Sequence, residues 1–88
     1  MVLLDLLGRR WTLRVLWELR DTPATFRELQ ARCDEISPAV LNTRLRELRS
    51  AAIVETGDDG YQLTASGRGL LEALAPLNAW AASWAKRR

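Results

Sequence analysis

Residues 36–50 read ISPAVLNTRLRELRS and predict one helix with a well-marked start. Ser37 is a suitable N-cap, because its hydroxyl can accept a hydrogen bond from a free N–H of the first turn. Pro38 suits the first helical position, where its missing N–H costs nothing. Three leucines recur at the i, i+4, i+7 spacing of one helix face: Leu41, Leu45 and Leu48. The stretch is therefore expected to pack against a core through one narrow apolar stripe.

The opposite face of this helix is small near its start and then polar and cationic. A helix that presents small residues, an amide and guanidinium groups can enter a DNA major groove. The candidate base contacts, led by Arg46, are Pro38, Ala39, Asn42, Thr43 and Arg46. Arg44 lies closer to the leucine stripe, where it serves packing or an ion pair. The alternative is an ordinary amphipathic helix whose outer face is only solvated.

The chain has 88 residues, which is enough for one small domain over residues 1–88. Its 13 basic and 11 acidic side chains give a formal charge of +2, a weak indication of a polyanionic partner. The positive charges gather near the start, in the 36–50 helix and at the end: Arg9, Arg10, Arg14, Arg44, Arg46, Arg49, Lys86, Arg87 and Arg88. Domains of this size are often stabilised by oligomerisation.

Histidine is absent and Cys33 is the single cysteine, so the sequence offers no internal disulfide and no zinc site. No nucleophile–base pair stands at a useful spacing, and we therefore expect a non-enzyme with no metal and no cofactor. Cys33 is expected to be a small buried residue rather than a reactive thiol. There is no signal peptide and no stretch that could span a bilayer, which predicts a cytoplasmic protein without a membrane partner.

Two helices are expected before residue 36. Residues 10–20 form the first, and its apolar face is built from Trp11, Leu13, Val15, Leu16 and Leu19. Trp17 falls off this stripe and is either a second contact surface or a partly exposed aromatic. Residues 2–7 form a helical turn or the remnant of a longer helix, which Gly8 ends.

A capping box opens the second of these helices, because Thr25 can cap its first turn while Glu28 reaches back. This helix is expected to carry Phe26, Leu29 and Cys33 inward. A short connector, residues 34–36, leads directly into the helix that follows. Two short helices joined in this way describe a helix-turn-helix.

After residue 50 the pattern changes from helix to strand. Residues 51–56 turn into a strand, residues 57–60 read GDDG and form a tight turn, and residues 61–63 form the return strand. Thr64 caps a final helical region, which Pro76 is expected to kink or split. An apolar seam recurs there at spacings of 4, 3, 4 and 3: Leu70, Leu74, Leu77, Ala81 and Trp84. Trp80 adds to a neighbouring face.

This order of elements predicts a mainly α fold with a small β-hairpin, a winged helix-turn-helix. Several motifs stand in a familiar order: LGRRWTL at 7–13, FREL at 26–29, ISPAVL at 36–41, RLREL at 44–48, YQLT at 61–64 and GR at 67–68. Through these motifs the chain resembles the HxlR-type family of bacterial winged-helix transcriptional regulators, itself similar to the wider MarR-like group.

The resemblance implies a DNA-binding homodimer that represses or activates a nearby operon. We expect a sequence-specific repressor that binds a palindromic operator in double-stranded DNA, located in the bacterial cytoplasm at the nucleoid. Family members place the recognition helix at Ser37 to Ser50 and the dimer surface in the N-terminal segment and the C-terminal helix, here residues 65–86. The expected dimer residues are Leu3, Leu7, Leu70, Leu74, Leu77, Trp80, Ala81 and Trp84.

Thr25 and Arg27, at the start of the preceding helix, are expected to hold phosphate through side chains and free N–H groups. Ser37 and Arg49, the latter on the flank of the 36–50 helix, are also expected to contact phosphate. The acidic tip of the wing, Asp58 and Asp59, would be repelled by phosphates and is expected to add little base readout. Family members often carry a cysteine before the first helix, which this chain lacks, and no small-molecule effector is identified. The rival hypothesis is a winged-helix module for protein–protein contact or dimerisation only, in keeping with the acidic wing and 4 tryptophans.

Overall fold

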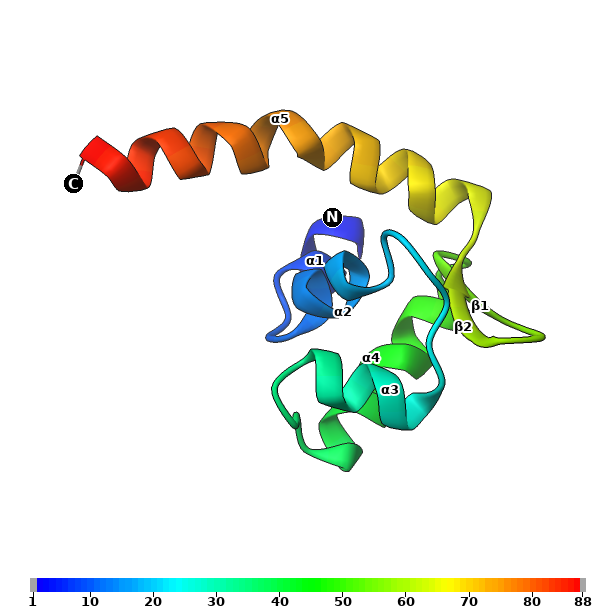
Figure 1. Ribbon diagram of the computed structural model, residues 1–88. Coiled ribbons are helices and arrows are strands. Elements are labelled where there is room, and N and C mark those ends of the chain that lie inside the picture. The colour runs from blue at the N-terminus through cyan, green and yellow to red at the C-terminus, as the bar shows by residue number, and fades with distance from the viewer. Residues whose placement is uncertain (1, 88) are drawn as a thin grey trace.

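The computed structural model describes residues 2–87, so that Arg88 of the C-terminal basic group lies outside the described residues. Within this range the chain forms five helices and one antiparallel hairpin, which confirms the predicted fold class (Figure 1). The elements are α1 (Val2–Leu7), α2 (Thr12–Glu18), α3 (Phe26–Arg32), α4 (Pro38–Ser50), β1 (Val54–Gly57), β2 (Gly60–Leu63) and α5 (Ala65–Arg87). None of the helices in this range is long and apolar enough to cross a membrane.

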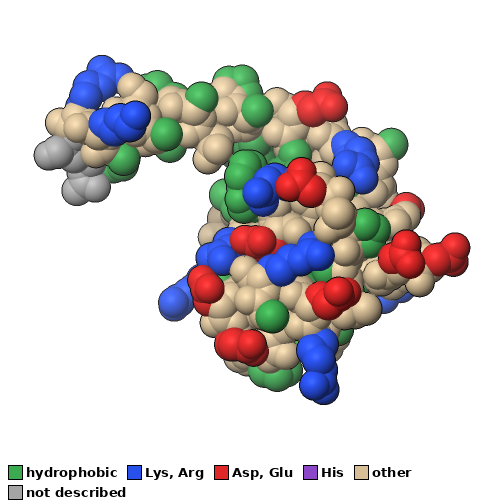
Figure 2. Space-filling model, in the orientation of Figure 1, with side chains coloured by type: hydrophobic (Ala, Val, Ile, Leu, Met, Phe, Trp, Pro, Cys, Tyr) green, Lys and Arg blue, Asp and Glu red, His purple; other side chains and the backbone are tan. Residues whose placement is uncertain are grey.

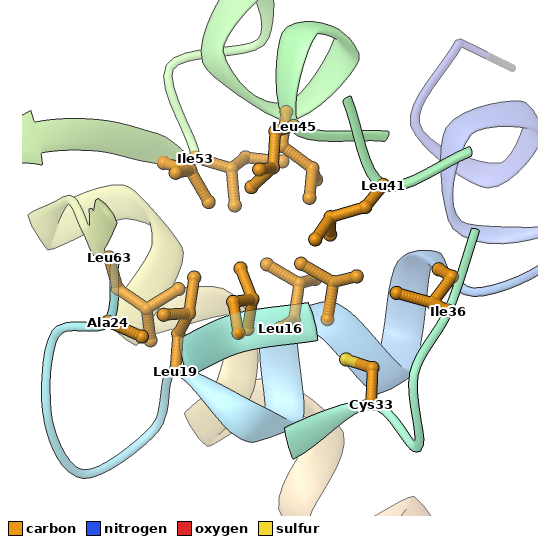
Figure 3. Packing of buried hydrophobic residues seen from close by; sticks show 13 residues of the cluster. Leu16, Leu19, Ala24, Cys33, Ile36, Leu41, Leu45, Ile53 and Leu63 are labelled. Carbon is orange, nitrogen blue, oxygen red and sulfur yellow. The ribbon is translucent and has the colours of Figure 1, made fainter. Parts of the chain in front are cut away.

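The core lies where α2, α3 and α4 meet, and the start of the hairpin closes it (Figure 3). Leu16 from α2, Leu29 from α3 and Leu45 from α4 are at most 1% exposed. The predicted stripe on α4 is confirmed, because Leu41 and Leu48 are also fully buried. Cys33 is buried in the same cluster, as expected.

The two helix starts in the helix-turn-helix are capped as predicted. Thr25 Oγ1 accepts from the Glu28 amide at 3.2 Å, and the Thr25 amide donates to Glu28 Oε1 at 2.9 Å. Ser37 Oγ accepts from the Val40 amide at 3.4 Å, with Pro38 in the first turn of α4. Between the helices, Asp34 and Glu35 adopt positive φ angles of 55° and 61°. This left-handed pair reverses the chain within a very short connector.

The hairpin is fixed to the helices through backbone hydrogen bonds. Val54 pairs with Leu63 and Gly57 with Gly60, which leaves Asp58 and Asp59 as the tip of the wing. Tyr61 and Ala24 exchange backbone hydrogen bonds of 2.7 and 3.0 Å, so that β2 is joined to the segment before α3. Thr64 Oγ1 accepts from the Gly67 amide at 3.0 Å, which confirms the predicted cap of α5.

Two predictions about the helix expected over residues 10–20 are wrong. The helix begins at Thr12 instead of residue 10, because Trp11 adopts a left-handed φ of 79° that no α-helix can contain. It ends at Glu18 rather than at residue 20. Leu13 is 47% exposed and does not widen the core, because its side of α2 faces α5 across a groove.

Pro76 does not split the C-terminal region. α5 runs without interruption from Ala65 to Arg87 and bends in its middle, and its second half extends past the body of the domain (Figure 1). Proline removes one hydrogen bond to the carbonyl four residues earlier, that of Glu72. Glu72 and Pro76 are both exposed, so that water can satisfy this carbonyl and the helix continues.

We expect Gly60→Ala to destabilise the fold by about 1–3 kcal/mol. Gly60 has a φ of 117°, and an added Cβ would collide with the backbone of Ala24. Gly69→Ala is the matched control, because a Cβ there meets nothing within 4 Å on the surface of α5. That change should be neutral or stabilise by up to about 1 kcal/mol. Urea denaturation followed by circular dichroism measures both, and equal midpoints for the two variants would contradict the role of Gly60.

Candidate nucleic-acid interface

The outer face of α4 is open to solvent over its whole length. Pro38, Ala39, Asn42 and Arg46 are exposed, as predicted for base-contacting residues. Thr43 is half-buried, and its hydroxyl donates to the Ala39 carbonyl at 3.0 Å. The Thr43 oxygen can therefore only accept a further hydrogen bond, whereas the Asn42 amide offers both donors and an acceptor.

The arginines of the domain divide into two groups. Some are bound within the fold: Arg14 donates to Glu18 Oε2 and to the Arg32 carbonyl, each at 2.8 Å. Arg32 in turn donates to the carbonyls of Glu18, at 3.0 Å, and Thr22, at 3.2 Å. These contacts tie α2 to α3 and leave the two guanidinium groups little freedom.

The second group makes no side-chain hydrogen bond or ion pair within residues 2–87: Arg10, Arg27, Arg46, Arg49 and Arg68. Arg46 and Arg49 stand on the outer side of α4, and Arg27 stands on the first turn of α3. A free guanidinium loses only water when it binds a phosphate or a base, while a bound one must first break its own contacts. The helix-turn-helix therefore presents its unpaired positive charges on the predicted DNA side.

Two predicted phosphate contacts already serve as helix caps. The hydroxyls of Thr25 and Ser37 accept from backbone amides, so each can only donate its own proton to an anion. The Thr25 amide is bound to the Glu28 carboxylate and is not free, contrary to our expectation of free N–H groups there. The hydrogen bonds from the backbone and side chain of Thr25 lower the pKa of Glu28, so a negative charge stands at this helix start. Arg27 is thus the stronger phosphate candidate on α3.

The inner side of α4 carries an ion-paired cluster. Glu47 Oε2 lies 3.3 Å from Arg9 Nε, and Glu47 Oε1 lies 3.4 Å from Arg44 Nη1. The ion pair foreseen for Arg44 is confirmed. The contact with Arg9 was missed, because these residues are far apart in the sequence and no local pattern links them.

An apolar surface follows α5 away from the body of the domain. Leu77, Trp80 and Trp84 are between 46 and 58% exposed, and the two tryptophan rings stack with centroids 6.1 Å apart. Trp80 and Trp84 belong to the second half of α5. In Figure 2 the projecting arm carries hydrophobic side chains, with basic side chains near its end. The acidic side chains at the end of the hairpin project on the opposite side of the molecule.

A groove of about 530 Å³ continues this surface between α2 and α5. Its walls are mainly apolar, and the principal lining residues are Leu13, Trp17, Leu71, Leu74, Leu77 and Ala81. Trp17 is 43% exposed, with the Arg20 guanidinium 3.9 Å from its ring centroid. Of the expected dimer residues in α1, Leu3 is exposed, while Leu7 packs partly against the core. Sequence reasoning missed the groove because it assigned Leu13 to the core.

Three comparisons relate this architecture to known proteins. A family model described as HxlR-like helix-turn-helix matches residues 6–88. The uncharacterized HTH-type transcriptional regulator YvaP of Bacillus subtilis is 29% identical over 87 residues, covering 91% of this chain and 81% of the relative. The crystal structure of quinone-bound YodB from B. subtilis matches with a TM-score of 0.85 and 34% identity, covering 93% of each chain. A structure described as a possible HxlR family transcriptional factor from Thermoplasma volcanium matches with a TM-score of 0.82 and 26% identity, covering 94% of this chain and 81% of the other.

We expect Cys33 to be unreactive in the folded protein. The side chain is fully buried, and burial raises the pKa of its thiol, which lowers the thiolate fraction. Alkylation by iodoacetamide should be on the order of 100-fold slower in native buffer than in denaturant, because it requires opening of the core. Mass spectrometry of quenched samples gives both rates, and similar rates would show that the thiol is accessible.

The raised pKa of Cys33 also has a consequence for stability. A thiol with a raised folded-state pKa stabilises the fold below the unfolded thiol's pKa of about 8.5, and this contribution is lost as the pH rises through the folded value. The free energy of unfolding should therefore fall more steeply above that pH in the wild type than in Cys33→Ala. Parallel pH slopes for the two proteins would contradict this linkage.

Proposed function

The chain belongs to the HxlR-like helix-turn-helix family and is a transcriptional regulator of that type, and we propose that it acts as a homodimeric repressor on a palindromic operator. The family is non-enzymatic, which confirms the expectation that this protein is not an enzyme. Membership in a helix-turn-helix family implies that the partner is DNA.

The observation that carries the proposal is the pair of free guanidinium groups on the outer face of a well-capped helix. Helix-turn-helix proteins place the first turns of their second helix against base edges in the major groove. In α4 these turns carry Pro38, Ala39, Asn42 and Thr43, and Arg46 follows one turn later. We assign base contacts to this set, with Arg46 bidentate to guanine, the commonest specific contact of arginine.

Phosphate contacts are assigned to the residues around this face: Thr25, Arg27, Ser37 and Arg49. Arg27 and Arg49 carry free positive charges, so they supply the sequence-independent part of the affinity. The caps Thr25 and Ser37 each contribute one hydroxyl proton. The acidic wing tip adds no attraction for phosphate, and we assign it no base contact.

The homodimer is supported by the apolar surface of α5 and its continuation into the groove. Large apolar patches on a small domain mark interaction sites, and a second copy carries the same patch. We propose that residues 65–86 form the dimerisation helix and that the partner's Trp80 and the partner's Trp84 cover the groove beside Leu13 and Trp17. The proposed interface residues are Leu3, Leu7, Leu70, Leu74, Leu77, Trp80, Ala81 and Trp84. A two-fold dimer presents two recognition helices, so that its operator is a palindrome.

Repression is the simplest outcome of such binding, because a dimer that occupies an operator can block transcription without contacting another protein. A bacterial operator lies in the cytoplasm, at the nucleoid, where we place the protein. Quinone is bound in the YodB structure, but we do not extend this ligand to the present chain. Its single cysteine is fully buried, and the effector remains open.

Replacing Arg46, which we assign to a base, and Arg27, which we assign to a phosphate, should separate base readout from phosphate binding. Arg46→Ala should relax specificity at one position in each half-site and lose roughly 1–3 kcal/mol of discrimination. Arg27→Ala should weaken all duplexes alike and reduce the salt slope by about 1. Selection from random duplex DNA, followed by salt titrations, measures both. If Arg46→Ala lowers affinity equally for selected and random duplexes, Arg46 does not read a base; no binding by the wild type would favour the protein-interaction alternative.

The dimer should depend on the two stacked tryptophans. The double variant Trp80→Ala, Trp84→Ala removes the largest exposed apolar side chains of the arm and should shift the protein to monomer at micromolar concentration. Arg68→Ala, on the exposed first turns of the same helix, is the control and should remain a dimer. Sedimentation velocity reports the mass. A wild type that is monomeric at this concentration would exclude the proposed dimer.

A further inference from the structure

The recognition helix carries one acidic residue, and its charge is paired with one arginine of the helix and one arginine from outside it. α4 has the sequence PAVLNTRLRELRS, in which Glu47 follows directly after Arg46. The Glu47 side chain is 26% exposed, and each of its oxygens faces one arginine, Arg9 or Arg44. A free carboxylate beside the proposed DNA-reading arginine would repel phosphates, so this pairing matters for DNA binding.

Arg44 and Arg9 share Glu47, and each contact is an ion pair without hydrogen-bond geometry. Both Arg44 Nε and Glu47 Oε1 are buried without a hydrogen-bond partner among residues 2–87. Arg9 supplies the second positive charge at 3.3 Å, with 52% of its own side chain exposed. A half-exposed ion pair of this kind is held by charge and is easily broken.

Arg9 belongs to the short connector between α1 and α2, directly after Gly8. Its backbone is fixed on both sides, because its amide donates to the Leu6 carbonyl at 3.2 Å and its carbonyl accepts from the Thr12 amide at 3.2 Å. The position of its guanidinium therefore follows the end of α1. Within residues 2–87, the Arg9–Glu47 pair is the one ion pair that joins this N-terminal segment to α4.

We propose that Arg9 is a positioning residue for DNA binding: it neutralises Glu47 and thereby links the placement of α1 to the electrostatic field of the recognition helix. When α1 shifts, Arg9 withdraws, and Glu47 keeps only its contact with Arg44 at 3.4 Å, so that the field beside Arg46 loses one positive charge. DNA affinity then falls although no DNA-contacting residue has moved. This inference rests on the proposed function and adds a route by which the N-terminal segment regulates it.

The test is a double-mutant cycle on duplex affinity, measured by fluorescence anisotropy with a duplex recovered by selection. Arg9→Ala should weaken binding by up to about fivefold, the effect of one partly exposed charge. Glu47→Gln alone should bind at least as tightly as the wild type. The double variant Arg9→Ala, Glu47→Gln should return to wild-type affinity, because the charge that Arg9 neutralised is gone. The diagnostic result is non-additivity, in which Arg9→Ala costs less affinity in the Glu47→Gln background than in the wild type.

Two controls keep the outcome clear. Arg10→Ala removes an adjacent exposed charge without a partner and should change affinity less than Arg9→Ala. Glu72→Gln removes an acid on α5, far from α4, and should not rescue Arg9→Ala. If Arg9→Ala has no effect, or if Glu47→Gln fails to restore its loss of affinity, the inference is wrong.

Hydrogen exchange separates this inference from the proposed function. In the protein without DNA, Arg9→Ala should speed amide exchange in the second half of α4 more than Arg10→Ala does. A wild type that binds no duplex would overturn both the function and the inference. A wild type that binds duplex while the two variants exchange alike would overturn the inference only.

Discussion

Burial of one leucine stripe on α4 determines the whole candidate interface. Leu41, Leu45 and Leu48 are fully buried against α2 and α3, and each contributes about 1.5–3 kcal/mol by leaving water. A helix can satisfy this stripe in only one rotational setting. Rotation by one residue position, about 100°, would expose the leucines and press charged side chains into the core. Packing on the inside therefore decides which residues the outer face of α4 presents to solvent.

The arginines of the domain follow the same division between a packed inner side and an open outer face. Arg14 and Arg32 hold α2 against α3 through carbonyls and carboxylates, where a strong, geometrically fixed donor is useful. Arg46 and Arg49 make no side-chain hydrogen bond or ion pair within residues 2–87 and keep their capacity to bind a partner. The overall charge of +2 conceals this arrangement, because acids pair with the structural arginines and leave the outer face of α4 positive. Net charge was accordingly a poor guide to the site.

Local chemistry made much of this structure predictable. The caps at Ser37 and Thr25, the leucine stripe, the hairpin turn and the Thr64 cap all follow from signals within a few residues, and the structure has each of them. The predictions failed where contacts between distant segments of the chain determine the structure. The left-handed Trp11, the exposure of Leu13 and the Arg9–Glu47 pair depend on how α1, α2 and α5 meet, and periodicity contains no information on this. The roles of individual residues in DNA or dimer contact were predicted from the same local patterns and stay predictions.

The bend of α5 at Pro76 sets the angle between the second half of this helix and the body of the domain. The missing hydrogen bond softens one exposed turn, and beyond it the helix continues to Arg87, a reach of about 16 Å at 1.5 Å per residue. In the proposed dimer this reach separates the apolar arm from the body that carries α4. Half-sites on DNA repeat about every 34 Å, so a small change of angle at the bend alters how well two recognition helices match that spacing. If the proposed dimer forms, the stiffness of this single exposed turn would govern the length of operator that the dimer accepts.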